Sequence, residues 1–364
     1  MSINQLYHTS LQQLRQLRPT ERITRVRAFA ALMSGIMQSR AVHLSHIALK
    51  IPGMAKELST VRRLERLLDN RALCVREWYA PIARAWLHSQ AHTTGEVRLI
   101  VDTTKVSFAH QQLMVALAFQ RRAIPIAWTW RRGAKGHSSA RIQIALLAYV
   151  RRLLPPNVPV VVVGDSEFEA GTLQAQLEEW GWGYVLRQKP NNQVQTASAR
   201  SWQAFRDLVR RAGQSVWVAG ARLTRKHERC ANLLAHWAEG EKDAWLLATN
   251  LPTRRAALRA YRRRMWLDEL FGDLKGHGFD LERSHLRHFA RLSRLTLAVV
   301  LLYAWLVRTA VRVIKRGLRH YVDRHDRRDL SIFQIGLRWI ERRLKNGQPF
   351  IMPFAPFELK LSGS

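Results

Sequence analysis

The chain has 364 residues, enough for two or three domains, and 47% of them are hydrophobic, so it can bury a large core. Lys and Arg number 59 against 27 Asp and Glu, a formal net charge of +32 that favours a polyanionic partner. The only cysteines, Cys74 and Cys230, exclude a Cys-x2-Cys zinc site and a disulfide framework.

The basic residues are spread from Arg15 to Arg343 rather than gathered in one tail, which predicts a long nucleic-acid track over a folded surface. RNA-binding proteins share this charge, so charge alone does not separate them from DNA-binding ones. No charged segment followed by an apolar one opens the chain, so we expect no signal peptide. With so few cysteines, this predicts a cytoplasmic, nucleoid-associated protein.

Residues 1–92 are expected to form a helical domain, since apolar residues recur three and four apart, as from Ile23 to Met33. A short helix over Leu44–Leu49 is followed by Ile51-Pro52-Gly53, and a second helix is predicted to start near Ser59, a good N-cap. This outline resembles a helix-turn-helix, although any small helical bundle can show it. The second helix would present three candidate DNA-binding arginines on one side: Arg62, Arg63 and Arg66.

Residues 93–310 have the pattern of an α/β domain with a mixed sheet. The valine run that ends at Gly164 is typical of a strand buried on both faces. The expected order is three strands, then helix, strand, helix and strand: Val97–Val101, Leu113–Phe119, Ile124–Trp130, Ile142–Leu153, Val158–Gly164, Leu173–Trp180 and Gly183–Arg187.

A polar stretch of about 190–242 interrupts this domain, and pieces such as Ser215–Ala219 predict a β-rich insertion. An apolar strand over Trp245–Ala248 follows, and helices are expected from Arg254 onward, with residues 311–364 forming a basic helical C-terminal region. The most apolar stretch, Leu295–Val307, is too short for an ordinary membrane span. It is expected to be a buried helix, and no membrane partner is predicted.

Two acidic residues occupy positions that need a chemical explanation. Asp102 lies in the first predicted strand, and Asp165 directly follows the valine run. A carboxylate at the end of a buried strand is costly unless it is paired or binds a metal, although Asp165 alone could simply cap a helix. On adjacent strands, the two carboxylates could share a pair of divalent cations, the arrangement used for phosphodiester chemistry.

A third acid is expected on a helix near the same sheet edge. At helical spacing, Tyr261, Arg264, Asp268 and Lys275 would share one face, beside an apolar stripe of leucines. Ordinary pairing of charged residues on a solvated helix would give a similar pattern, but it does not explain why these groups recur near two strand-end aspartates.

At these residues the chain resembles the DDE transposases of bacterial insertion sequences in the insertion-sequence-four group. These enzymes have an RNase H-like core interrupted by a β insertion, and a Tyr-x2-Arg-x3-Glu-x6-Lys signature around the third acid. The resemblance covers roughly residues 20 to 330 and places the family's functional positions on Asp102, Asp165, Tyr261, Arg264 and Lys275. It also places a DNA-stacking tryptophan at Trp245.

The signature departs from the family at its acid. The position in register holds Asp268, and the glutamate comes one residue later, as Glu269. Register with Arg264 and Lys275 favours Asp268 as the third metal ligand, with Glu269 as the alternative. A degraded copy with weak activity is the third interpretation.

The resemblance implies two Mg²⁺ or Mn²⁺ ions held by these acids, cleavage of a phosphodiester by water, hairpin formation, hairpin opening and strand transfer into target DNA. It implies element ends and target DNA as partners, and a homodimer on paired ends. Two other readings stay open: a transposase-derived DNA-binding protein without activity, and a host nuclease with the same fold.

Overall fold

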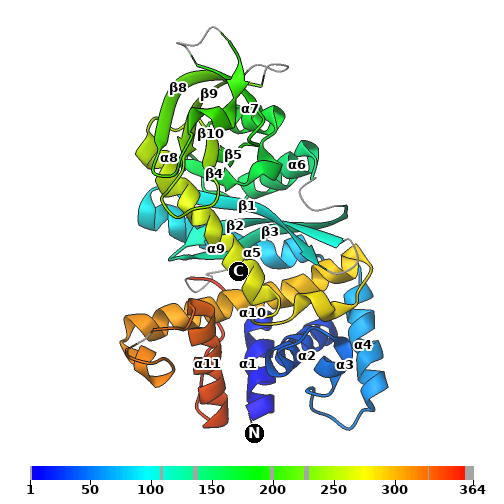
Figure 1. Cartoon of the computed structure of the whole chain (residues 1–364). Helices are drawn as coiled ribbons and strands as arrows, with labels where there is room; N and C mark the ends of the chain where they lie inside the picture. Colours follow the sequence, from blue (N-terminus) through cyan, green and yellow to red (C-terminus); the bar gives the residue numbers. More distant parts are fainter. Residues whose placement is uncertain are drawn as a thin grey trace. The chain divides into compact units, whose positions relative to one another are not determined.

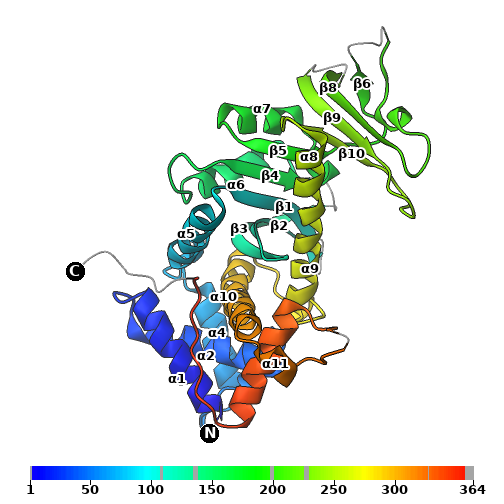
Figure 2. The same ribbon diagram turned by 90° about the vertical axis from the view of Figure 1, so that its left-hand side faces the viewer.

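The computed structural model describes residues 2–106, 110–133, 138–196, 201–224, 229–326 and 328–356. The chain divides into two compact units, which Figures 1 and 2 show from two sides. The helical unit consists of Met1–Ser89, Val106–His110 and Leu270–Ser364, and the sheet unit of Gln90–Lys105 and Gln111–Glu269.

The helical unit is formed by both ends of the chain. Helix α10 packs against α2, α4 and α11, so the N-terminal and C-terminal helices share one core. In that core Tyr303 stacks on Phe333, with 5.5 Å between ring centroids. The long helices that contribute are α1 (Ser2–Leu17), α2 (Ile23–Ser39), α4 (Glu57–Asp69), α5 (Val75–Thr94, which continues into the sheet unit), α10 (Phe289–Lys315) and α11 (Ile332–Lys345).

Helix α10 contains the most apolar stretch of the sequence. By length and composition it could cross a membrane, but 72% of its most apolar window is buried inside the structure. The prediction of a buried helix over Leu295–Val307 is therefore confirmed.

The expected helical pair near the N-terminus is present with different boundaries. Helix α3 spans Leu44–Ala48, and α4 begins at Glu57 after Lys56, so the prediction of Ser59 as the N-cap is wrong. A glutamate in the first turn suits the positive end of the helix dipole, which lets the helix start earlier. Residues 49–56 separate the two helices, a longer connection than the short turn of a helix-turn-helix.

The sheet unit contains a ten-stranded mixed sheet in the order β3-β2-β1-β4-β5-β10-β9-β8-β6-β7. Strands β1, β4 and β5 are parallel neighbours, and β10 runs antiparallel to β5. Every strand predicted before residue 190 is present, so the mixed α/β sheet is confirmed. The bounds are β1 (Val97–Val106), β2 (His110–Phe119), β3 (Arg122–Arg132), β4 (Val160–Gly164), β5 (Gly183–Arg187) and β10 (Trp245–Thr249).

Helices cover both faces of this sheet. Figure 1 shows α6 (Ala140–Arg151) and α7 (Gly171–Glu179) on one face and α8 (Arg254–Tyr261) on the other. Helix α8 packs on β4 and β5 through Ala257, Ala260 and Tyr261. Central strands covered in this way are apolar on both faces, as the valine run of β4 requires.

The β structure expected at about 190–242 is present and extends the same sheet. It contains β6 (Gln193–Gln195), β7 (Gln203–Ala204), β8 (Ser215–Leu223) and β9 (Arg229–His236), and β9 pairs with β10. A small core of its own includes Phe205, Leu223 and Leu233.

The compact units differ from the three consecutive segments expected from the sequence. Residues 1–89 belong to one unit with residues 270–364, because the N-terminal helices pack on α10 as well as on one another. The break in composition near residue 92 coincides with the start of the sheet unit.

Candidate active site

The parallel strands β1 and β4 bring Asp102 and Asp165 side by side. Val101 is in register with Gly164; Asp102 follows Val101 within β1, and Asp165 directly follows the end of β4. A Cβ on Gly164 would come within 3.0 Å of the side chains of Val101 and Phe168, so glycine lets the end of β4 approach β1 closely. The predicted adjacency of the two acids is confirmed.

The carboxyl group of Asp102 is almost completely buried, with 6% of the residue exposed. It accepts a 2.6 Å hydrogen bond from the backbone N–H of Thr103 and a 3.1 Å hydrogen bond from Arg264. Burial raises the pKa of Asp102 to about 8; the neighbouring charge of Asp165 adds to this effect and the charge of Arg264 opposes it. The positive charge of Arg264 therefore does not offset the effect of burial on Asp102.

Asp165 has the capping role that a lone strand-end aspartate would have. Its Oδ1 accepts a 2.9 Å hydrogen bond from the backbone N–H of Glu167, at the start of the 3₁₀ turn Ser166–Phe168. Burial raises the pKa of Asp165 as well, against the hydrogen bond from Glu167 and the charge of Arg264. Because Oδ1 of Asp165 caps the 3₁₀ turn, the other carboxylate oxygen, Oδ2, is not needed for the cap and could bind a ligand.

Arg264 links two of the candidate acids. Its Nη1 lies 3.1 Å from Asp102 Oδ2, and its Nη2 lies 3.2 Å from Asp268 Oδ2. The guanidinium group thus places a positive charge where the acids converge. The register that favours Asp268 over Glu269 agrees with this contact, since Asp268 is one helical turn from Arg264.

Glu269 turns away from Arg264. Its carboxylate pairs with Arg122, a buried arginine at the start of the edge strand β3. Glu269 thus turns toward the edge of the sheet. The side chains of Asp268 and Glu269 are 42% and 51% exposed, so neither third-acid candidate is buried like Asp102.

The predicted continuous helix from Tyr261 to Lys275 is broken. Helix α8 ends at Tyr261, Arg262–Arg264 form a 3₁₀ turn, and α9 spans Met265–Leu274. Lys275 follows the end of α9, belongs to the helical unit, and pairs with Glu282 at 2.8 Å. The expectation that all four signature residues share one helical face is therefore wrong for Lys275.

Tyr261 and Trp245 are in contact, with ring centroids 5.1 Å apart in an edge-on arrangement. Tyr261 is 2% exposed, and burial raises its pKa. Trp245, at the start of β10, is half-buried and packs on the same apolar cluster. Core packing thus accounts for much of both rings, and only Trp245 keeps exposed surface.

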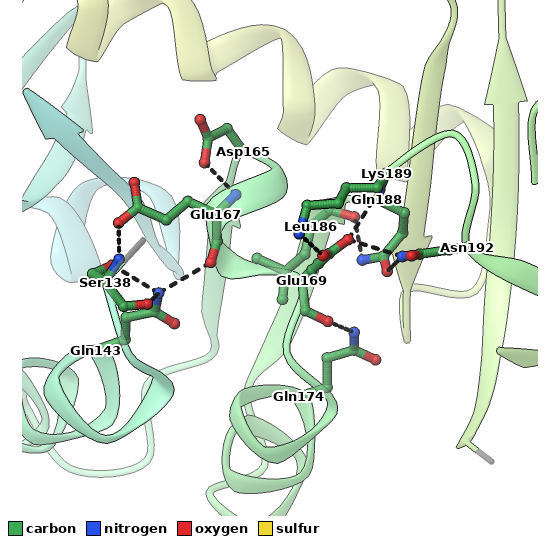
Figure 3. Close-up of polar contacts among 10 residues, drawn as sticks. All are labelled: Ser138, Gln143, Asp165, Glu167, Glu169, Gln174, Leu186, Gln188, Lys189 and Asn192. Carbon is green, nitrogen blue, oxygen red and sulfur yellow. Dashed lines mark hydrogen bonds and ion pairs between the residues drawn. The ribbon is translucent and has the colours of Figure 1, made fainter. Parts of the chain in front are cut away.

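Glu167 is a residue that the sequence analysis did not single out. Figure 3 shows it beside Asp165, reaching Ser138 at the start of α6. Its Oε1 accepts hydrogen bonds from the Ser138 N–H at 2.7 Å and from the Thr103 hydroxyl at 3.1 Å. Gln143 donates to the carbonyls of Ser138 and Glu167. Glu167 therefore ties β1, next to Asp102, to the segment that carries Asp165; its place two residues after Asp165 was the available signal.

A second network in Figure 3 fixes the other side of this segment. Glu169 accepts hydrogen bonds from the backbone N–H of Lys189 at 3.0 Å and from the Asn192 amide at 2.8 Å, and Gln174 donates to its carbonyl at 2.9 Å. The segment after β4 is thus held at both of its ends.

The donor set suits a hard divalent cation, since carboxylate oxygens are the ligands that Mg²⁺ and Mn²⁺ prefer. Among the described residues, no three His, Cys, Asp or Glu side chains are grouped closely enough to hold a metal as they lie. Arg264 occupies the space between Asp102 and Asp268. A third ligand from α9 therefore requires Arg264 to release one of the two carboxylates.

The three arginines predicted to bind DNA are exposed on α4, while Leu64, Leu67 and Leu68 of the same helix are buried. Arg62 and Arg66 line a cavity of about 480 Å³ together with Ser59, Glu65, Asp69 and Arg291. Arg291, from α10, pairs with Asp69 at the end of α4. The predicted amphipathic character of α4 is confirmed.

No family model matches this chain, and no curated protein matches it. Among solved structures it is similar to one described as the cryo-EM structure of a piggyBac transposase synaptic complex with hairpin DNA. The match has a TM-score of 0.42 and 9% sequence identity, and covers 98% of this chain and 84% of that chain. Similarity of this degree does not establish a common fold or function.

Proposed function

We propose that the protein is a DDE transposase that resembles those of the insertion-sequence-four group. It would bind the terminal inverted repeats of its element, cleave DNA strands in a metal-dependent reaction, form a hairpin at each end, and transfer the ends into target DNA. Its sheet would be an RNase H-like core, interrupted by the insertion β6–β9.

One observation carries this proposal: Asp102, within β1, and Asp165, just after the end of β4, lie side by side on parallel strands, both with raised pKa values. A purely structural pairing of buried Asp102 with half-buried Asp165 would be costly, because burial penalises each charge and the two charges repel. Raised pKa values of this kind are typical of functional sites, where a substrate or cation supplies the missing positive charge. The net charge of +32 supports a polyanionic substrate.

Asp102, Asp165 and Asp268 are proposed to hold two Mg²⁺ or Mn²⁺ ions, with Glu269 as the alternative third ligand. When bound, such ions activate a water molecule and stabilise the leaving 3′-oxygen of a phosphodiester. Arg264 would exchange its carboxylate partners for a phosphate near the scissile bond, since a guanidinium group binds either kind of anion with two parallel hydrogen bonds.

The remaining residues are proposed to position DNA. Tyr261 would support Trp245, whose exposed surface would stack on a base. Lys275 and the α4 residues Arg62, Arg63 and Arg66 would contact phosphates. A homodimer on paired ends, in the cytoplasm, completes the proposal.

The deciding experiment measures hairpin formation on a pre-nicked duplex that carries the element's own end, with Mg²⁺ or Mn²⁺. We expect wild-type activity, and none for Asp102→Asn or Asp165→Asn, with DNA affinity changed less than threefold because affinity comes from the basic surface. Loss of DNA binding in parallel with cleavage would mean that these acids are structural. Strand cleavage without hairpin formation or transfer would favour a nuclease.

A catalytically inactive DNA-binding protein is the second candidate. The observation that favours it is the exposed Asp268, already paired with Arg264. Specific binding of the element end by wild-type protein, with no cleavage under either metal, would decide for it.

A further inference from the structure

A second feature of the helical unit has the composition of a ligand site. A cavity of about 360 Å³ lies between the end of α10, helix α11 and the segment that follows it. Ligand pockets in proteins are about 300–1,000 Å³, so one nucleotide-sized group fits. Three kinds of side chain line the cavity: arginines (Arg312, Arg316, Arg343), aromatic rings (Trp339, Phe350) and apolar or small residues that include Pro349, Ile351 and Pro353.

The charge in this cavity is of one sign. No acidic residue lines it, and among the described residues none forms an ion pair with Arg312 or Arg316. Arg343 makes one long hydrogen bond, of 3.4 Å, to the Pro349 carbonyl. Permanent cations with several donors each favour a phosphate group.

Aromatic rings line the cavity together with the arginines. Trp339 is half-buried, and the Arg343 guanidinium lies over its ring at 5.0 Å from the centroid. Tyr321, 50% exposed, lies 6.4 Å from Trp339 and is covered by Arg342 at 5.5 Å. Alternating rings and guanidinium groups are a surface on which nucleic-acid bases stack.

Cations in the last turn of a helix also stabilise its negative end, and both α10 and α11 end here. That role accounts for the arginines at the end of each helix taken separately. It does not explain why three of them share an apolar-walled cavity with a tryptophan and with no acid.

We propose that this cavity binds a nucleoside phosphate, with the base against Trp339 and the phosphate on Arg312, Arg316 and Arg343. The nucleotide could belong to a DNA single strand or be free in solution; the recognising chemistry is the same. This inference does not rest on the proposed cleavage activity.

The test uses full-length protein in EDTA, so that no metal-dependent cleavage takes part. The probe is a 5′-phosphorylated tetranucleotide with one 4-thiothymidine, which crosslinks to neighbouring side chains under ultraviolet light. We expect the crosslink in the peptide from Ile332 to Ile351. Crosslinks confined to other parts of the chain would overturn the proposal.

Substitutions then separate the base from the phosphate. The double variant Arg312→Ala/Arg316→Ala should lower crosslinking at this peptide about tenfold. The single variant Arg316→Gln, at an exposed residue, should lower it severalfold. Trp339→Ala should lower it about tenfold because stacking is lost, whereas Trp339→Phe should retain most of it. The matched control is Arg338→Ala, an exposed arginine on α11 that does not line the cavity.

Competitors distinguish the sources. Unlabelled tetranucleotide that competes far better than thymidine monophosphate supports a DNA strand, and equal competition per mole supports a free nucleotide. Inorganic phosphate that competes as well as either would show a simple anion site and overturn the proposal. So would an effect of Arg338→Ala equal to that of the cavity variants.

Discussion

At the residue scale, Arg122 separates the two candidates for the third acid. It holds Glu269 at the sheet edge, while Arg264 holds Asp268 beside Asp102. Two residues next to each other on a helix point about 100° apart, so only one of them can face Asp102 and Asp165.

We therefore expect Asp268→Asn to stop hairpin formation on a pre-nicked end and Glu269→Gln to reduce it less than tenfold. Asp268→Glu should remain active, because the longer side chain restores the residue of the resembling family. An active Asp268→Asn with an inactive Glu269→Gln would move the ligand to Glu269. No effect of either substitution on an active enzyme would place the third ligand elsewhere.

Burial of Asp102 also predicts a pH dependence of stability. Its pKa is raised from 3.8 to about 8, so between these values the unfolded chain releases a proton that the folded protein retains. Stability from this group is thus present below pH 4 and is lost as the pH rises to 8.

Asp102→Asn removes this titration, so in EDTA it should stabilise the protein clearly more at pH 8 than at pH 5. Urea unfolding at both pH values measures the difference. The control is Asp207→Asn, an exposed carboxyl in the sheet unit. The same gain at both pH values would contradict the raised pKa.

At the element scale, the segment after β4 depends on Glu167. Removing its carboxylate leaves the Ser138 N–H and the Thr103 hydroxyl without their acceptor. Glu167→Ala should therefore destabilise the protein by about 1–3 kcal/mol in urea unfolding. It should also slow any cleavage more than the exposed control Glu239→Ala, because Thr103 adjoins Asp102. Equal stability of the two variants would remove Glu167 from the site.

The crossing of α10 and α11 depends on Gly336. A Cβ there would lie 2.0 Å from the Leu306 carbonyl oxygen, a backbone atom that cannot move alone. Gly336→Ala should cost about 3 kcal/mol or more, at the upper end for overpacked cores. Gly276→Ala, where a Cβ meets nothing within 4 Å, is the control and should be close to neutral. A stable Gly336→Ala protein would mean that the two helices cross differently.

At the scale of the whole molecule, the charge of +32 predicts steep salt dependence. Duplex affinity should fall by about 10³-fold or more between 50 and 200 mM salt if six or more phosphates are neutralised. A fluorescence-anisotropy titration measures the log–log slope. A slope near zero would contradict a polyanion-binding surface.

The sequence predicted the strands and the adjacency of Asp102 and Asp165, because a run of valines and an acid at its end are local patterns. It did not predict the 3₁₀ turn at Arg262–Arg264, since consecutive arginines carry no helix-breaking signal. The sequence did not predict the ion pair between Glu269 and Arg122 either, because these residues are far apart in the chain. The sequence also did not predict which helices share a core. An amphipathic pattern shows that one face of a helix is buried, but it does not show which element covers that face.

The helical unit is built from N-terminal and C-terminal helices, so it can be completed only after the sheet unit has been synthesised. The N-terminal helices are made first, but α10, on which α2 and α4 pack, is made after the whole sheet unit. Contacts between segments so distant in sequence form late and slowly, so the surfaces of α2 and α4 that pack on α10 stay exposed while residues 90–269 fold. A truncated chain that lacks α10 would thus contain a folded sheet unit preceded by N-terminal helices with exposed apolar surfaces. Such truncated products would be substrates for chaperones and proteases rather than competitors for DNA.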